Sequence, residues 1–369
     1  MKILPVHTRS EQQIFHRVAD TVYRNIPEWV PYLPQDIESI FSRHNPLVQS
    51  GGRFERWVAI IDHVPVGRIA AFTFPSRTDV GGIGFWETID DAELNHRLFQ
   101  TAEKWLRNHK RTAVEAPINF GTRGSYWGLL LEHHSPPSFQ ENFQPHYYRQ
   151  LIEQEGYSEK FRQHTYLISK ATFNADRLIR VAQKLQQRGH SFQYRHFSFE
   201  QLASYAQAAA RIYNEGWQHL EGFIPVTDEE VRRLLDKIHS IVIPELIWFA
   251  FDHDRPIGYI VMIPDLNEYL RRIGGRIRWW NQWLLPLLFR WYPPRRLKGL
   301  VFGVVPDYHN KGVDVMLVYH FYRSVMQYPK IQTAELAWVG SFNPRMQRFM
   351  QNIGCTTAKI HATYSKVIA

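Results

Sequence analysis

The chain has 369 residues, of which 44% are hydrophobic and 14% aromatic, and its formal net charge at pH 7 is +9. This composition excludes a disordered chain, and this length exceeds one ordinary hydrophobic core, so we expect two globular domains. The excess of cations favours an anionic partner, such as a phosphorylated cofactor, a nucleic acid or an acidic membrane surface.

Three features bear on cellular location. The single cysteine, Cys355, excludes a disulfide framework and fits a reducing compartment. The first residues, MKILPVHTRSEQQ, lack the apolar core of a signal peptide. No apolar run reaches the roughly 18 residues that would span a bilayer. We therefore expect a cytoplasmic protein, either free or peripheral to the inner membrane.

The first half alternates between strand and helix patterns. Ser10 is expected to cap the first helix, and Asp90 and Asp91 to cap the longest one. In chain order, the patterns predict a strand at 3–7, helices at 11–24 and 36–41, strands at 54–61, 65–74 and 83–88, a helix at 92–108, a strand at 112–118, a helix at 147–155 and a strand at 165–169.

From about residue 171 the same order begins again. The patterns predict a strand at 192–196, helices at 199–213 and 228–238, strands at 246–251, 256–263 and 300–305, a helix from 313, a strand at 332–339, a helix after 343 and a strand at 358–367. This period predicts a tandem repeat of one fold, with domains at 1–170 and 171–369.

The stretch from Leu300 to Val325 carries the clearest chemistry. An apolar run ends at Pro306, Gly312 lies in the polar turn that follows, and helical spacing begins at Val313. A strand, a glycine-bearing turn and a helix present free backbone N–H groups and the positive end of a helix dipole to a phosphate. Lys311 would lie beside that site.

This stretch resembles motif A of the GNAT acyltransferase superfamily, in which a strand ending V-x-P-x-Y is followed by a Q/R-x-x-G-x-G/A loop. The residues from Val304 to Tyr308 match the strand. The loop matches less well, because His309 and Asp314 replace two of its usual residues. The helix from Asn343 to Gly354 resembles motif B of the same superfamily, with a methionine at the usual tyrosine position.

The resemblance implies an α/β (α+β) fold of two tandem GNAT domains, each with a mixed, mostly antiparallel central sheet flanked by helices. It also implies an acyl-CoA-dependent N-acyltransferase that moves an acetyl or longer acyl group to a primary amine, without a metal. The CoA-binding residues that it implies are Val304, Val305, His309, Asn310, Lys311, Gly312, Val313, Asp314 and Asn343. The equivalent turn of the first half holds the acids Glu87, Asp90 and Asp91, which would repel a pyrophosphate, so we expect one cofactor site per chain.

Amide formation needs a base that takes a proton from the amine, and a donor that faces the thioester carbonyl. Glu335, on the predicted strand at 332–339, is the first candidate base. Tyr308 and His309 are further catalytic candidates, because the resemblance places them near the thioester. Met350 stands at the motif B position where the resemblance implies a tyrosine that protonates the CoA thiolate, so Tyr308 is the candidate that could supply this acid instead. The backbone N–H of Val304 or Val305 is the implied donor to the oxyanion.

The segment 266–298 has no counterpart in a minimal GNAT domain. It contains eight Arg and Lys residues with one acid, Glu268, and a dense run of Trp and Leu that includes Trp280 and Trp283. Such a segment fits contact with an anionic membrane or an amphiphilic amine, but it also fits simple packing on the protein. Nucleic acid ranks lower because Leu residues cluster with the Trp residues in this segment. Some bacterial tandem-GNAT proteins that the chain resembles are implicated in N-acylation of long-chain lipid amines.

Two other functions stay open at this point. The imperfect pyrophosphate loop and the positive charge also suit a Fem-like transferase that uses aminoacyl-tRNA. A degenerate double GNAT that binds CoA, lipid or protein without catalysis is the non-enzymatic alternative.

Overall fold

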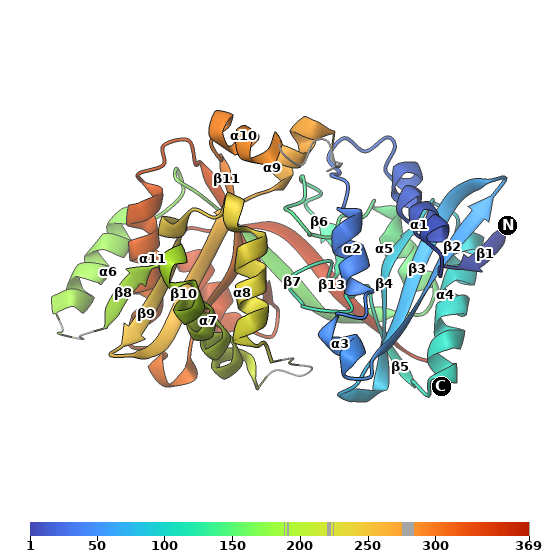
Figure 1. The fold of residues 1–369 in the computed structure, drawn as a ribbon, viewed down its shortest axis with the longest axis horizontal. Coiled ribbons are helices and arrows are strands. Elements are labelled where there is room, and N and C mark those ends of the chain that lie inside the picture. Colours follow the sequence, from blue (N-terminus) through green and yellow to red (C-terminus); the bar gives the residue numbers. More distant parts are fainter. Residues whose placement is uncertain (188, 190–191, 220–222, 224, 275–283, 369) are drawn as a thin grey trace.

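The computed structural model describes residues 1–187, 189, 192–219, 223, 225–274 and 284–368. Figure 1 shows one long, twisted sheet that runs through both halves, with helices packed along it. The elements of the first half are β1 (Lys2–Pro5), α1 (Arg9–Val22), α2 (Pro34–Ile40), α3 (Pro46–Gln49), β2 (Arg53–Ile61), β3 (Val64–Phe74), β4 (Arg77–Thr88), α4 (Ala92–Asn108), β5 (Ala113–Ala116), β6 (Leu129–Glu132), α5 (Tyr147–Gln154) and β7 (Ser158–Ser169).

The second half repeats this order, as the sequence predicts, once the additional elements α3, β6, α6, α9 and α10 are set aside. Its longer elements are α6 (Ala175–Gln187), β8 (Gln193–His196), α7 (Leu202–Trp217), α8 (Asp228–Lys237), β9 (Ile247–Asp252), β10 (Arg255–Pro264), α9 (Asn267–Leu270), α10 (Leu284–Trp291), β11 (Arg296–Val304), α11 (Val313–Val325), β12 (Thr333–Gly340), α12 (Pro344–Asn352) and β13 (Thr356–Val367). Its short 3-10 helices are η1 (Phe199–Gln201), η2 (His239–Ile241), η3 (Pro244–Leu246), η4 (Arg271–Ile273) and η5 (Pro306–Tyr308).

In the described part of the chain, all the strands belong to one sheet. Its order is β1-β2-β3-β4-β5-β13-β7-β12-β11-β10-β9-β8, and β6 pairs with β13 beside this path. Neighbouring strands are antiparallel except for β4 with β5 and β11 with β12, which are parallel. Each half therefore has a mixed, mostly antiparallel sheet with one parallel pair, and this confirms the predicted fold class.

The last strand of each half lies in the sheet of the other half. β13 pairs with β5 on one side, where Tyr364 lies opposite Ala116, and with β7 on the other side. β7 also pairs with β12, where Leu167 lies opposite Glu335. The sequence places β7 as the closing strand of the first half but gives no sign of this exchange.

Local signals account for the ends of several helices. Thr8 and Glu11 form a capping box that starts α1, so the predicted cap, Ser10, is wrong and lies inside the helix. Asp91 caps α4 by accepting a hydrogen bond from the N–H of Leu94 at 2.9 Å, as predicted. These caps satisfy backbone N–H groups that have no partner within the helix.

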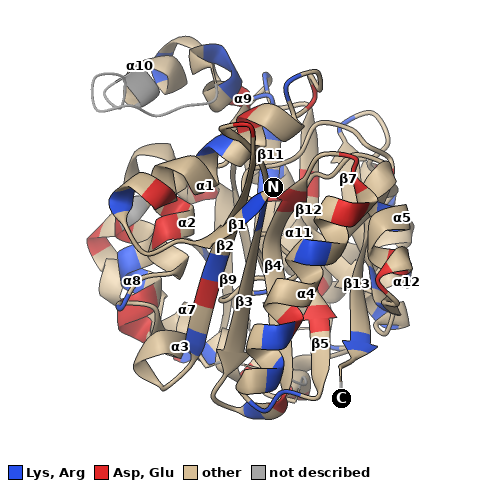
Figure 2. Ribbon diagram, turned by 90° about the vertical axis from the view of Figure 1, so that its right-hand side faces the viewer, with Lys and Arg blue, Asp and Glu red and all other residues tan. Residues whose placement is uncertain are grey.

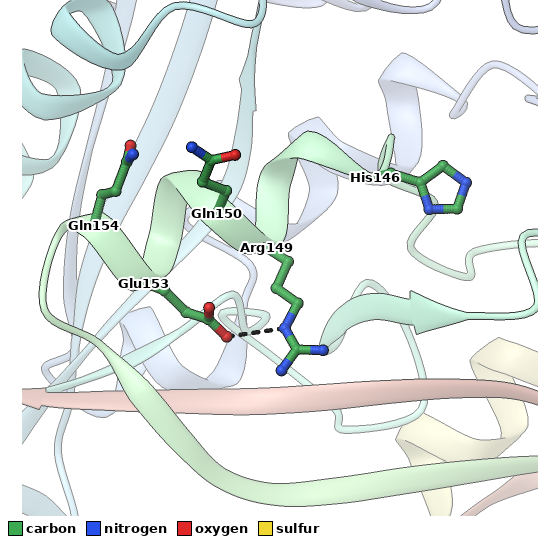
Figure 3. Close-up of a pocket in the computed structure, with 5 residues that line it drawn as sticks. All are labelled: His146, Arg149, Gln150, Glu153 and Gln154. Carbon is green, nitrogen blue, oxygen red and sulfur yellow. Dashed lines mark hydrogen bonds and ion pairs between the residues drawn. The ribbon is translucent and has the colours of Figure 1, made fainter.

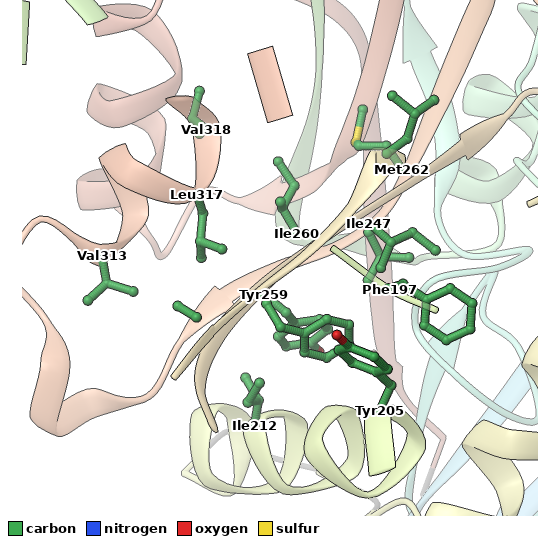
Figure 4. Close-up of a cluster of buried hydrophobic side chains, with 14 of the residues drawn as sticks. Phe197, Tyr205, Ile212, Ile247, Tyr259, Ile260, Met262, Val313, Leu317 and Val318 are labelled. Atoms are coloured by element: carbon green, nitrogen blue, oxygen red, sulfur yellow. The ribbon is translucent and has the colours of Figure 1, made fainter. Parts of the chain in front are cut away.

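Each half has its own hydrophobic core, and the exchanged strands contribute to these cores. Figure 4 shows β10 of the second half between α7 and α11, with Tyr259 toward α7 and Leu317 on α11 at the other side. In the first half, Ala362 and Tyr364 of β13 are fully buried in the core that α4 and β3 also build. The exchange therefore places side chains of the second half in the first core.

Candidate functional site

The parallel strands β11 and β12 separate soon after they begin. They pair from Arg296 opposite Thr333 to Lys298 opposite Glu335, and no later pair between them occurs among the described residues. Beyond this point β12 stays paired with β7. One edge of β11 is therefore free of a neighbouring strand, and its backbone groups can bond to a bound molecule.

The two valines at the end of β11 differ in their backbone bonds. Val305 donates its N–H to the carbonyl of Ile257 at 2.9 Å, so it cannot also serve as the implied oxyanion donor. N–H directions alternate along an antiparallel ladder, and Val304 lies opposite Gly258 in this ladder. The N–H of Val304 therefore points away from β10, toward the gap between β11 and β12.

The turn after β11 requires its glycine. Gly312 has a φ of +79°, a left-handed value that glycine adopts without a steric cost. A Cβ atom there would also lie 2.6 Å from Leu185 of α6. Backbone conformation and packing thus account for Gly312 whether or not a phosphate binds beside it.

The start of α11 offers free donors to an anion. The cap residue, Gly312, has no side chain to bond the helix, and no partner is described for the N–H groups of Val313 and Asp314. Asp314 turns its carboxylate to the N–H of Val315 at 2.9 Å, so this acid stays at the helix start. Helix N-termini favour negative ligands, but this carboxylate offsets part of that preference.

Two cations flank the same turn. The Lys311 ammonium lies 4.5 Å from the centre of the Tyr308 ring. Arg345, from the first turn of α12, donates to Asn310 Oδ1 at 3.0 Å and so links the two helix starts. Sequence reasoning missed Arg345, although its place two residues after the Asn343 cap could have indicated that it lies at the start of the helix.

Tyr308 is placed away from the gap. Its hydroxyl donates to Asp252 Oδ2 at 2.6 Å, and this bond raises the pKa of Tyr308. Asp252 ends β9, which lies on the far side of β10 from β11. The geometry therefore does not support the predicted role of Tyr308 as the acid that replaces Met350, because its proton is held at β9.

His309 is closer to the gap. Its Nε2 lies 2.9 Å from the carbonyl oxygen of Val304. A carbonyl oxygen can only accept, so Nε2 carries the proton and Nδ1 of the neutral ring keeps a free lone pair. The side chain is exposed, and no partner of Nδ1 is described. His309 can therefore accept a proton from a molecule bound beside Val304.

Glu335 lies at the centre of a buried ion cluster, which consists of Glu141, Asp265, Arg296, Glu335 and Lys359. Lys359 is fully buried and donates to both oxygens of Glu335 at 2.8 Å. Arg296 also donates to Glu335, and its Nε lies 3.4 Å from Asp265 Oδ2. Both Glu335 oxygens are thus occupied, which argues against the predicted role as a free base.

The first half completes this cluster. Ser138 donates to Glu335 Oε1 at 2.6 Å, and Glu141 Oε2 lies 2.9 Å from the Lys359 ammonium. Burial opposes ionisation of Glu141, but the charge and hydrogen bond of Lys359, together with the charges of His361 and Lys298, outweigh it and lower the pKa of this carboxyl to about 2. The cluster therefore joins the segment before α5 to the paired beginnings of β11 and β12.

Two residues of motif B have structural roles. Asn343 caps α12 by accepting from the N–H of Met346 at 3.1 Å, so its side-chain oxygen is occupied by the helix. Met350 is buried against Tyr166 of β7 and Val339 of β12. The predicted contact between Asn343 and the cofactor stays a prediction.

The two cavities described lie outside the gap. Figure 3 shows the larger, of about 490 Å³, lined by His146, Arg149, Gln150, Glu153 and Gln154 along α5. One helix forms all of this lining, so we assign no site there. The second, of about 310 Å³, lies between α6, β8 and α11, next to the turn, and is lined by Leu185, Gln186, Phe192, Tyr194, Lys311, Met316 and His320. In the part of the chain that the structure describes, no group of three His, Cys, Asp or Glu residues could hold a metal ion.

The corresponding gap in the first half is closed. β4 and β5 pair through Gly82 opposite Glu115, and the N–H of Ile118 then bonds to the carbonyl of Ile83 at 2.9 Å. A Cβ at Gly84 would lie 1.8 Å from the Ile118 oxygen. The segment after β5 thus lies against β4 where the second half has its gap.

The acids of the first half are also engaged. Glu87 is buried and pairs with Arg68 at 2.8 Å, and burial raises the pKa of its carboxyl. Asp91 caps α4. Glu87 lies at the end of β4 and Asp91 at the start of α4, so the closed strands and these acids both disfavour a second anion site.

We expect one CoA per chain by isothermal titration calorimetry, bound at the turn of the second half. Lys311→Glu should weaken CoA binding about ten- to hundred-fold, because hydrogen bonds to charged groups contribute about 1.5–3 kcal/mol each. Lys104→Glu, at an exposed position of α4 in the first half, serves as the matched control and should bind as the unmodified chain does. Two CoA molecules per chain, or equal affinities of the two variants, would contradict this placement.

Solved structures with the same fold cover the whole chain. A tandem GNAT protein from the clavulanic acid biosynthesis pathway aligns with a TM-score of 0.57 at 10% identity, covering 100% of this chain and 98% of that one. A GCN5-related N-acetyltransferase from Sphaerobacter thermophilus aligns with a TM-score of 0.51 at 12% identity, over 99% and 96% of the two chains. The chain therefore has the tandem GNAT fold, which confirms the resemblance seen in its motifs.

Two curated proteins align over nearly their full length. The bacterial ceramide synthase of Caulobacter vibrioides is 24% identical over 382 residues, covering 100% of this chain and 98% of that protein. Protein YghO of Escherichia coli is 24% identical over 369 residues, covering 98% and 94%. No family model matches the chain.

Proposed function

We propose that the chain is an acyl-CoA-dependent N-acyltransferase whose second half binds the CoA thioester. The observation that carries this proposal is the difference between the two halves. In the second half, β11 and β12 separate and a glycine turn leads into a helix with free N–H groups. In the first half, the same place is closed by Ile118 against β4. A thioester entering the open gap would lie along the free edge of β11.

The chemistry that we propose uses the end of β11. The N–H of Val304 would donate to the thioester oxygen as negative charge develops on it. His309, whose Nε2–H is held by the Val304 carbonyl, would take the amine proton on Nδ1. The nitrogen then bonds to the acyl carbon, and the C–S bond breaks to release CoA thiolate. Glu335 would have a structural role and not a catalytic one, because its ion pair with Lys359 would hold the beginnings of β11 and β12 in place.

The acceptor that we propose is an amphiphilic primary amine. The relative named as a bacterial ceramide synthase aligns over nearly its whole length, and a ceramide is the N-acyl derivative of a long-chain amine. The described end of the segment 266–298 presents aromatic and cationic side chains close to the start of β11. The apolar tail of such an amine could contact these aromatic side chains.

The test is incubation with acetyl-CoA and longer acyl-CoAs and a panel of amines, with released thiol as the readout. His309→Ala should lower kcat about 10²–10⁴-fold, the usual contribution of general acid–base catalysis, while CoA affinity stays within a factor of two or so. His44→Ala, at an exposed position of the first half, is the control and should keep full activity. Full activity of His309→Ala would exclude its role as the base. No thiol release with any pair would contradict the proposed function and leave the aminoacyl-tRNA and non-catalytic alternatives.

A further inference from the structure

The end of the molecule near α9 and α10 carries exposed apolar side chains. Trp291 is 65% exposed, Tyr292 44% and Leu287 42%. Figure 2 shows α10 projecting from one end of the molecule, above α9, and basic residues lie in α10 and in η4, which follows α9. We call this surface the α9–α10 face, and its described residues are Arg271, Arg272, Leu287, Arg290, Trp291, Tyr292 and Arg295. Trp280 and Trp283, which the sequence singles out, lie outside the described residues.

The cations of this face have no acid beside them on their own segment. Between 266 and 298, the one acid is Glu268, and its Oε2 accepts from the backbone N–H groups of Arg295 and Arg296 at 3.0 Å. Arg271 lies near Glu28 of the first half and donates to its carbonyl oxygen. Arg290 and Arg295 are exposed, and no side-chain partner is described for either. The face is therefore apolar and positive together.

We propose that the α9–α10 face docks on an anionic lipid bilayer. Trp, Tyr and Leu side chains would enter the region between headgroups and acyl chains, and the arginines would meet lipid phosphates. Trp291 projects beside Leu287 because the two are four residues apart on α10, on one helix face. This inference goes beyond the proposed function, since docking does not depend on acyl transfer.

Two other partners fit the face less well. A second copy of this chain would bring the same four arginines, Arg271, Arg272, Arg290 and Arg295, to a self-complementary interface, where like charges repel. A single-stranded nucleic acid needs open aromatic faces on which its bases can stack. Trp291 offers one exposed ring, but the Tyr292 ring is covered by Arg272 at 4.2 Å, and Phe289 stacks on Tyr269 with ring centres 3.9 Å apart, so the described residues form no row of open rings for successive bases.

Docking in this way would leave the cofactor turn uncovered. α10 leads into the start of β11 at Arg296, and the turn at 309–314 follows the other end of this strand. Nine residues of β-strand span about 30 Å, so the face and the turn lie at opposite ends of β11. CoA could therefore enter from water while the α9–α10 face contacts the bilayer.

The experiment is sedimentation of the full chain with vesicles of phosphatidylglycerol and phosphatidylcholine, compared with vesicles of phosphatidylcholine alone. We expect binding to the anionic vesicles that weakens as salt increases. Arg290→Gln with Arg295→Gln should weaken this binding about thirty-fold, because each cation near an anionic leaflet contributes about five-fold. Arg177→Gln with Arg180→Gln, both exposed on α6, remove equal charge elsewhere and should bind as the unmodified chain does.

The apolar part has its own test. The double variant Leu287→Ser, Trp291→Ser should reduce the vesicle binding that remains at high salt. The control is Leu234→Ser, at a residue of α8 that is 51% exposed, and it should leave this binding unchanged. Circular dichroism melts check that the variants stay folded, and the arginine variants decide the question if the serine variants unfold. Absence of vesicle binding, equal binding to neutral vesicles, or equal effects of the α6 and α10 arginine pairs would overturn the proposal. So would dimerisation through this face, seen by analytical ultracentrifugation, with no vesicle binding.

Discussion

Residues 1–170 and residues 171–369, expressed separately, should each fail to form a cooperatively folded domain. The reason is the exchange of β7 and β13, which leaves β5 of the first half and β12 of the second without a neighbouring strand on one edge. The first half would also lose Ala362 and Tyr364 from its core, and an unpaired strand edge favours aggregation. The measurement is near-UV circular dichroism with urea unfolding, in which a separate half should show no cooperative transition.

A graft provides the matched control. Leu167 of β7 lies opposite Thr356 of β13 in an antiparallel pair, so a short Asn-Gly turn can join residue 169 to residue 355. This chain, 1–169 followed by the turn and 355–368, restores the missing neighbour of β5 and should unfold cooperatively. Co-expression of the two separate halves should likewise give a folded heterodimer. If 1–170 alone unfolds cooperatively with the same midpoint as the graft, the exchange is dispensable.

This exchange shows which part of the fold the sequence could predict. Residue patterns placed the predicted strands and helices in the correct order, because caps such as Asp91 and Asn343 act on neighbours three residues away, but they missed α6 and β6 among other elements. The partner of a strand is a different matter. Alternation along β7 is the same whether β7 pairs with its own half or with β12, so no local signal distinguished the two arrangements.

In the candidate site, too, local features could be predicted from the sequence, whereas contacts between distant residues could not. The turn that holds Gly312 is local, and the glycine has the left-handed conformation expected of it. The partners of Tyr308 and Glu335 are distant in sequence: Asp252 holds the first, and Ser138 and Lys359 hold the second. Sequence reasoning considered each of these side chains alone and so overestimated its freedom to catalyse. Lys359 lies inside the strand predicted at 358–367, but nothing in its neighbours indicates that it meets Glu335.

Lys359→Met should destabilise the protein by about 3–5 kcal/mol, since it leaves two buried carboxylates, Glu141 and Glu335, without the cation that they share. Thermal and urea unfolding measure this loss. The control is Arg97→Met, which breaks an exposed pair with Glu93 and should change stability by about 0.5 kcal/mol or less. Glu141→Gln in the Lys359→Met background should recover part of the loss, because Glu141 has lost its ion pair with Lys359, whereas Glu335 still pairs with Arg296. A loss as small as that of Arg97→Met would show that the buried ion cluster does not join the halves.

The same variant should change the response to acid. Lys359 makes the largest contribution to keeping the pKa of Glu141 at about 2 in the folded protein, below its ordinary value of 4.5. A carboxyl with a lowered folded pKa adds stability at pH values above its unfolded pKa, and this stability is lost as the pH falls from about 4.5 toward 2. Without Lys359, burial is opposed by less charge and the pKa of Glu141 rises, so Glu141 contributes less stability at neutral pH and the variant enters the acid range with less stability to lose. Acid unfolding of Lys359→Met, followed by circular dichroism, should therefore begin at a higher pH than that of the unmodified chain, whereas Arg97→Met should follow the unmodified curve. Coincident acid curves for all three would mean that Lys359 does not hold Glu141 ionised.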